Sequence, residues 1–248
     1  MKSLRLVAAL ICTGLFSLSV QAETVQLTSL EWPPYTGSEL PQQGASMAVV
    51  EAAFDAMGHD LEVQFLPWQR AVDQAKENTA IAGYFPEYYA ESLEEDFIFS
   101  DRIGTGPLGL VERTDNPIEW SNLGDLTDHT IGTVSGYVNT AEFDAMAEGG
   151  EIDVQPVTDD ATNLRKVAGG RIPLAVVDSN VFDYLVSDEL SNLKSDLQMN
   201  DKLLEQKDLY VAFARNDKGE RTAEILNEGL EKIDQEKIMK DALKRIMN

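Results

Sequence analysis

The sequence predicts an α/β protein of two lobes joined by a hinge that the chain crosses twice. One observation is that strand-like and helix-like segments alternate over residues 24–85 and again over 129–179. Strands that alternate with helices form a parallel sheet covered by helices, so each stretch should build one lobe. The other observation is a pair of extended segments, 105–113 and 206–215, that flank the second stretch. We expect both to run between the lobes.

These patterns divide the chain into four parts. Residues 1–22 form a leader, 23–108 begin lobe 1, 109–206 form lobe 2, and 207–248 return to lobe 1 with C-terminal helices. The sequence has no internal repeat and no low-complexity linker between these parts. Two crossings between two lobes predict a hinge about which the lobes can close.

Lobe 1 should open with the order strand, helix, strand, helix, strand. The first strand alternates apolar and polar residues, and apolar residues recur at helical spacing in the first helix until Gly58 ends it. Pro67 marks the end of the second strand. The five segments are 24–30, 47–58, 61–68, 70–78 and 79–85.

Lobe 2 should repeat this alternation, and the chain should end in helix. A strand runs into a glycine turn, and two helices that stop at paired glycines are each followed by a strand. Residues 220–247 carry apolar side chains mostly on one helical face, so we expect them to pack back on lobe 1. The segments of lobe 2 are 129–137, 138–150, 152–157, 159–170 and 172–179.

The N-terminus has the three parts of a secretory signal. Lys2 and Arg5 precede a short apolar run, and Ala22 follows Val20 and Gln21 at the expected cleavage point. The only cysteine, Cys12, lies inside this leader, so the secreted chain should have no disulfide, no thiol chemistry and no lipid. Since no other segment is long and apolar enough to cross a bilayer, we expect the protein in the periplasm or outside the cell.

Composition argues against several function classes. The formal net charge of −23 makes nucleic acids and anionic membrane surfaces unfavourable partners. The two histidines, His59 and His129, do not have metal-ligand spacing, and neither a nucleophile elbow nor a phosphate-binding loop is present. We therefore expect no enzyme, no cofactor and no metal, and we expect a monomer.

The loops that follow the predicted strands carry the candidate binding residues. In open α/β sheets ligands bind at the carboxyl ends of strands, and the segment LEWPPYTG occupies such a position. Its prolines should stiffen the loop and present Trp32 and Tyr35 to a ligand at low entropic cost. The alternative is that Trp32 packs on its own lobe. Tyr84 and Phe85 end another strand, and alternation predicts that only one of them faces the ligand.

The order of several motifs resembles solute-binding protein family 3, the periplasmic receptors of amino-acid-type ABC transporters. The resemblance covers nearly all of residues 23–248, and its most specific element is Phe99-Ser100-Asp101 ahead of the first crossing. It implies a two-lobe type II periplasmic binding protein fold that closes on a small solute. The motifs, in chain order, are EWPPYTG, GASMAVVEAAFDAMG, FLPWQRA, FIFSD, IGTVSGY and AVVD.

The resemblance lacks one element, the arginine that forks onto the α-carboxylate of an amino acid. Family members usually carry it between the third strand and the FSD motif, where this chain has several acidic residues and no arginine. Arg70, which follows Trp68 in FLPWQRA, and Arg102 are the candidate substitutes. Each of them has an alternative role as a surface or lobe-packing residue. We include Trp68 among the candidate ligand contacts.

Lobe 2 contributes two further candidates. Ser135, Gly136 and Tyr137 precede a predicted helix, whose free N–H groups would favour an anionic or polar group of the ligand. The alternative is an ordinary glycine turn. Asp178 matches the family position whose carboxylate typically receives a ligand's ammonium group, and its alternative role is a cap for the helix that follows.

Taken together, these features predict a periplasmic solute-binding protein. It would capture a small polar solute, an amino acid or a related amine or carboxylate, and deliver it to an ABC transporter permease. The second hypothesis is a receptor domain that reports its ligand to a membrane sensor protein. A periplasmic enzyme on the same fold is the third, and the missing arginine and the short chain both argue against it.

Overall fold

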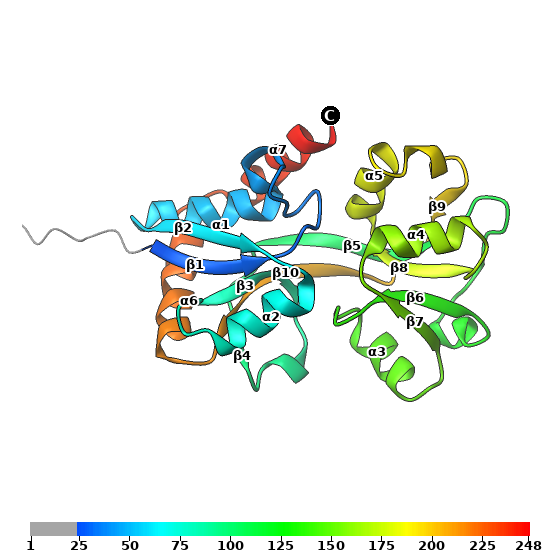
Figure 1. The fold of residues 1–248 in the computed structure, drawn as a ribbon, viewed down its shortest axis with the longest axis horizontal. Helices are drawn as coiled ribbons and strands as arrows, with labels where there is room; N and C mark the ends of the chain where they lie inside the picture. Colours follow the sequence, from blue (N-terminus) through cyan, green and yellow to red (C-terminus); the bar gives the residue numbers. More distant parts are fainter. Residues whose placement is uncertain (1–23) are drawn as a thin grey trace, which may run out of the picture.

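The computed structural model describes residues 24–248, and the predicted leader lies outside them. One continuous ten-stranded sheet extends through two lobes, with helices on both faces of each half (Figure 1). The main path of the sheet has the order β2-β1-β3-β10-β5-β8-β6-β7, and the short strands β4 and β9 pair with β10 and β5. The predicted two-lobe α/β architecture is confirmed. No helix within 24–248 is long and apolar enough to span a membrane.

Lobe 1 contains a parallel half-sheet in which β1 is central. β1 pairs with β2 along its whole length and with β3 near its end, both in parallel register. The second strand is shorter than predicted, because Pro67 caps the following helix and Trp68 is already its first residue. The elements are β1 (Thr24–Ser29), α1 (Ala45–Ala56), β2 (Asp60–Phe65), α2 (Trp68–Glu77), β3 (Gly83–Tyr88) and β4 (Phe97–Phe99).

Lobe 2 repeats the arrangement with β6 between β7 and β8, again in parallel. Its helices have side-chain caps: Thr140 accepts a bond at the start of α3, Asp159 at the start of α4 and Asp178 at the start of α5. The elements are β6 (Thr130–Val134), α3 (Ala141–Glu148), β7 (Asp153–Val157), α4 (Asp160–Ala168), β8 (Leu174–Asp178), α5 (Ser179–Ser187) and β9 (Leu197–Met199).

The lobes are joined by two long antiparallel strands, β5 (Gly104–Arg113) and β10 (Glu205–Ala214). They pair with each other over Gly104–Leu108 and Glu205–Leu209. Beyond this overlap β5 continues into lobe 2 beside β8, and β10 continues into lobe 1 beside β3 (Figure 1). The two extended segments predicted as crossings are these strands. The lobe boundaries assigned from the sequence stay a prediction.

The C-terminal segment packs on lobe 1, as expected, but it forms two helices. Asn216 caps α6 (Asp217–Leu230), and Asp234 caps α7 (Gln235–Met247) after a short turn. Both helices lie against α1. The remaining short elements are the 3-10 turns η1 (Pro41–Gln43), η2 (Glu91–Leu93), η3 (Leu123–Leu126) and η4 (Ser191–Leu193).

Gly229 makes the contact between α6 and α1 close, which gives a first test of the fold. A Cβ at this position would lie 2.1 Å from the backbone oxygen of Ala53. We expect Gly229→Ala to lower the free energy of unfolding by about 1–3 kcal/mol, because the helices would have to separate. Urea denaturation measures this change. Glu224→Ala, at an exposed position of the same helix, is the control. A stabilised Gly229→Ala protein would show that the helices are not in contact there, since alanine is otherwise the better helix former.

Candidate functional site

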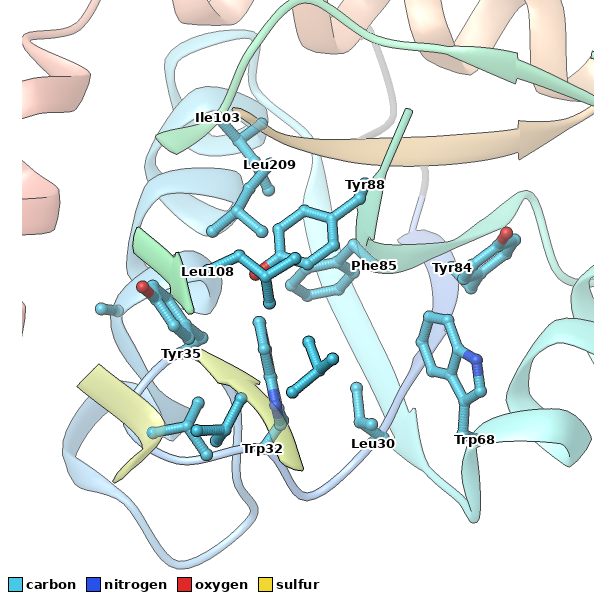
Figure 2. Packing of buried hydrophobic residues seen from close by; sticks show 14 of the residues in the cluster. Leu30, Trp32, Tyr35, Trp68, Tyr84, Phe85, Tyr88, Ile103, Leu108 and Leu209 are labelled. Carbon is cyan, nitrogen blue, oxygen red and sulfur yellow. The ribbon is translucent and has the colours of Figure 1, made fainter. Parts of the chain in front are cut away.

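The loop after β1 forms a tight turn that holds two stacked aromatic rings. The backbone N–H groups of Tyr35 and Thr36 both donate to the carbonyl of Trp32, and Trp32 and Thr36 form an isolated bridge. The rings of Trp32 and Tyr35 stack with centroids 4.7 Å apart. Figure 2 shows them beside Tyr88 and Leu108 in a packed cluster. Trp32 is 7% exposed and Tyr35 is fully buried, so both rings are shielded from solvent.

Trp32 bonds directly to lobe 2. Its Nε1 donates to Oδ2 of Asp160 at 3.1 Å. Asp160 is the first residue of α4, at the carboxyl end of β7, and it is buried. The alternative that Trp32 packs only on its own lobe is therefore wrong, because its polar edge lies against the other lobe.

Asp178 receives hydrogen bonds from both lobes. Its Oδ1 accepts from the backbone N–H groups of Asn180 and Val181, which caps α5. The hydroxyl of Tyr35 donates to the same carboxylate at 3.1 Å, and that of Tyr88 donates at 3.4 Å. Capping and a position in the interlobe site are thus compatible, since Oδ2 takes no part in the cap and accepts from both hydroxyls.

Trp68 forms a third bridge between the lobes. Its Nε1 donates to the carbonyl of Gly136 at 2.9 Å. Its ring makes edge contacts with Tyr84 of lobe 1 and Tyr137 of lobe 2 at centroid distances of 5.4 and 5.5 Å. Tyr137 also contacts Trp32 at 6.3 Å. An aromatic cluster drawn from both lobes therefore surrounds the interlobe site.

Glu87 lies inside this cluster, although it belongs to an acidic stretch of the sequence. It belongs to β3 and is 5% exposed. The hydroxyl of Tyr84 donates to its Oε2 at 3.0 Å, and the backbone N–H of Tyr88 donates to its Oε1 at 2.8 Å. Burial raises the pKa of Glu87 to about 8, although both hydrogen bonds and the charge of Lys207 act to lower it.

The two carboxylates of lobe 2 are also shifted. Burial raises the pKa of Asp178 to about 7 against the lowering effect of its hydrogen bonds. Burial likewise raises the pKa of Asp160 to about 7, and the charge of Asp178 adds to that shift, while the hydrogen bond from Trp32 opposes it. Three carboxyl groups with pKa values of about 7 to 8, gathered where the lobes meet, are typical of a functional site.

Two cavities adjoin this cluster. The inner cavity is small, with a volume of about 20 Å³, which is room for about one water molecule. It is lined by Leu30, Trp32, Trp68, Pro86, Glu87, Tyr88, Tyr137, Val138 and Leu209. The outer cavity is an open cleft of about 710 Å³ between the lobes, and its walls include Trp32, Trp68, Tyr137, Asp160 and Tyr184. The two cavities share Leu30, Trp32, Trp68 and Tyr137 as lining residues.

Several predicted residues lie outside the cluster or act differently. Arg70 is exposed on α2, and it lines neither cavity. Arg102 lies on the surface near Asp208 and Glu236, at 3.7 and 3.4 Å. Tyr84 and Phe85 are both fully buried and neither lines the inner cavity, so alternation did not separate a core residue from a cleft residue.

The turn after β6 does not offer free N–H groups from Ser135 and Tyr137. The backbone N–H of Ser135 donates to Val157 O, and that of Tyr137 donates to Val134 O. The helix α3 begins only at Ala141, where Thr140 caps it. The prediction of an anion site made by these groups at a helix N-terminus is therefore wrong. What the turn contributes is the carbonyl of Gly136, whose φ of 80° favours glycine, and the ring of Tyr137.

Sequence reasoning missed four residues that the fold brings to the site. Asp160 follows the carboxyl end of β7, the one strand end of lobe 2 whose loop was not considered. Tyr88 lies in the segment GYFPEYY, and Asn180 donates to the hydroxyl of Tyr35 at 2.7 Å. Lys207 lies in the predicted crossing segment and is buried. Gln206, Asp208 and Arg215 lie in the same segment, so the local sequence did not single out Lys207.

Comparisons with known proteins agree with this geometry at the level of the fold. No protein-family model matches the chain, and no curated protein matches it. Among solved structures, it is similar to a histidine kinase sensor domain with similarity to periplasmic binding proteins: TM-score 0.76, 17% identity, 92% of this chain and 97% of the other covered.

Two further structures match over a similar span. One is the GluR0 ligand-binding core from Nostoc punctiforme in complex with L-glutamate, with TM-score 0.71, 14% identity, and 90% and 98% coverage. The other is an amino acid ABC transporter substrate-binding protein from Streptococcus pneumoniae bound to L-arginine, with TM-score 0.72, 14% identity, and 91% and 96% coverage. The chain has the type II periplasmic binding protein fold, which both binding proteins and sensor domains use.

The raised pKa values predict that contact between the lobes depends on pH. The ordinary pKa of an aspartic acid is 3.8, and both Asp160 and Asp178 are raised to about 7 where the lobes meet. Their contribution to closure is fully present below about pH 4 and is lost as the pH rises through about 7, because ionisation then favours the solvated, open arrangement. We expect the radius of gyration from small-angle X-ray scattering to increase over this range.

The double variant Asp160→Asn, Asp178→Asn is the control, because asparagine accepts hydrogen bonds without titrating. Its radius of gyration should change less from pH 4 to pH 8 than that of the wild type, because only Glu87 of the three raised carboxyls is left to titrate. Identical pH profiles for the two proteins would show that these carboxyls do not control the contact.

Proposed function

We propose that this protein is a periplasmic solute-binding protein whose lobes close on a small polar solute. The observation that carries the proposal is the convergence of aromatic donors from lobe 1 and buried carboxylates from lobe 2 at the hinge. Trp32 and Tyr35 reach Asp160 and Asp178 directly. A solute that enters as the lobes separate would exchange these contacts for its own, and it would favour closure by touching both lobes.

The chemistry of the site favours a solute with an ammonium group. Asp178 already accepts two hydroxyl donors and two backbone donors, so it can accept hydrogen bonds from an ammonium group in place of the hydroxyls. The rings of Trp32, Trp68, Tyr88 and Tyr137 would contribute apolar and cation–π contact. Two of the similar structures contain amino acids, L-glutamate and L-arginine, which agrees with a solute of this size.

Delivery to an ABC transporter permease is the role that we propose for the liganded protein, after export through the predicted leader. A membrane sensor protein is the second candidate partner. The direct bonds between the lobes favour this second role, because they let the chain stabilise its own closed arrangement, and a sensor can use both arrangements as signals. Permease and ATPase genes beside this gene would support transport, whereas a sensor gene would support signalling.

A thermal-shift screen tests the binding proposal. The purified protein is screened against amino acids, polyamines, small carboxylates and short peptides. A ligand at 100 times its Kd should add about 2.7 kcal/mol to the stability, which raises Tm by roughly 5–10 °C for a chain of this size. A folded protein whose Tm does not change with any member of the panel would argue against a small polar solute.

Asp178 gives a sharper test once an amine-bearing ligand is found. Asp178→Asn keeps an oxygen that can cap α5, but it removes the charge that would pair with an ammonium group. We expect affinity to fall by about 2 kcal/mol or more, about 30-fold in Kd, measured by calorimetry.

The matched control is Asp234→Asn, since Asp234 caps α7 in lobe 1 in the same way. That variant should bind like the wild type. If Asp178→Asn also retains its affinity, Asp178 does not contact the ligand.

A further inference from the structure

Lys207 lies on the face of the sheet that carries the interlobe site. It pairs with Gly106 where β10 and β5 cross between the lobes. Residues directly opposite each other in an antiparallel pair project to the same face. A Cβ on Gly106 would lie 2.2 Å from Oδ2 of Asp178 and 2.8 Å from the hydroxyl of Tyr35, so that face looks into the site. The absent side chain of Gly106 leaves space for these groups beside Lys207.

The side chain of Lys207 is largely buried, and its ammonium has few partners. Its side chain is 9% exposed, and its ion pair is with Oε1 of Glu205 at 3.8 Å, a residue that is itself half exposed. Within residues 24–248, Nζ has no hydrogen-bond partner at normal distance and lies 5.4 Å from the ring centroid of Tyr88. An ammonium has three donors, and a buried charge whose donors are unused costs free energy. Lys207 can therefore accept an anionic partner.

Tyr88 lies between this cation and the carboxylate of Asp178. Its ring faces Lys207, while its hydroxyl donates to Asp178 at 3.4 Å, which is long for a bond between oxygens. The same residue lines the inner cavity. One neutral side chain thus contacts both a positive and a negative group of the site, and both contacts are weak enough for a ligand to replace.

We propose that Lys207 is the anion-binding residue of the interlobe site. The solute would present an anionic group to Lys207 and an ammonium to Asp178, with Tyr88 displaced from between them. This inference rests on the proposed function and names the class of solute: a molecule that carries both charges. Such a role would let the site bind a carboxylate although Arg70 and Arg102 lie outside it.

An alternative role for Lys207 is to offset the charge of Glu87, because the charge of the lysine lowers the pKa of that carboxyl. In that role the lysine would influence every ligand of the cleft alike, whether or not the ligand carries a carboxylate. A comparison of ligands that differ only in a carboxylate therefore distinguishes the two roles.

The test uses pairs of probes in which one member is the decarboxylated form of the other. The pairs are L-arginine and agmatine, L-lysine and cadaverine, L-alanine and ethylamine, L-phenylalanine and phenethylamine, and γ-aminobutyrate and propylamine. Calorimetry gives Kd for each probe with the wild type, Lys207→Met and Lys207→Arg. Lys240→Met, at an exposed position of α7, is the matched control, and Tm confirms that each variant is folded.

We expect the wild type to bind the carboxylate-bearing member of at least one pair more tightly than the amine. Lys207→Met should raise the Kd of that member at least tenfold and change the Kd of its amine less than twofold. Lys207→Arg should keep most of the wild-type affinity. Lys240→Met should bind both members like the wild type.

Three results would overturn the proposal. An equal loss for both members, or no loss, would leave Lys207 with only a structural role. A wild-type protein that binds only the amines would exclude Lys207 as the anion partner while the proposed function stands. A wild-type protein that binds no probe would overturn the inference together with the proposal of a small charged solute.

Discussion

The rest of the site depends on the hydrogen bonds that the carboxylate of Asp178 accepts. Asp178 is the last residue of β8. Its carboxylate caps α5 and accepts a hydrogen bond from the hydroxyl of Tyr35 in the other lobe. These roles reinforce each other, because the two backbone donors fix the carboxylate in the direction from which Tyr35 approaches. Gly106 is part of the same constraint, since any side chain there would occupy the place of Oδ2.

Burial gives this contact its chemical character. The aromatic rings that pack around Glu87, Asp160 and Asp178 exclude water, and exclusion of water raises the pKa of all three carboxyls. The same rings supply the donors that partly offset that cost, from Trp32, Tyr35 and Tyr84. A cleft built in this way can exchange neutral internal donors for a charged ligand, which is the property that a closing receptor needs.

Much of the fold could be predicted from the sequence, because the evidence for it is local. Alternation, helical spacing and glycine stops placed the strands and helices of residues 24–85 and 129–179 within a few residues, and the two crossings were found as extended segments. What could not be predicted was the direction in which particular side chains and N–H groups point. Glu87 shares a stretch with several exposed acids, yet it lies in β3 and points inward. The turn at Ser135 precedes a helix in sequence, but the N–H groups of Ser135 and Tyr137 already donate to backbone carbonyls of Val157 and Val134.

The sequence by itself determined the order of the elements, the two crossings and the strand-end loops that hold Trp32, Tyr35 and Asp178. Only the tertiary structure decided which of these side chains meet. Tyr35 and Asp178 are 143 positions apart, and their contact depends on the register of β5 with β10 and on how the lobes pack. Local patterns fix backbone conformation, whereas contacts across a hinge depend on the relative placement of two lobes, which no local pattern encodes.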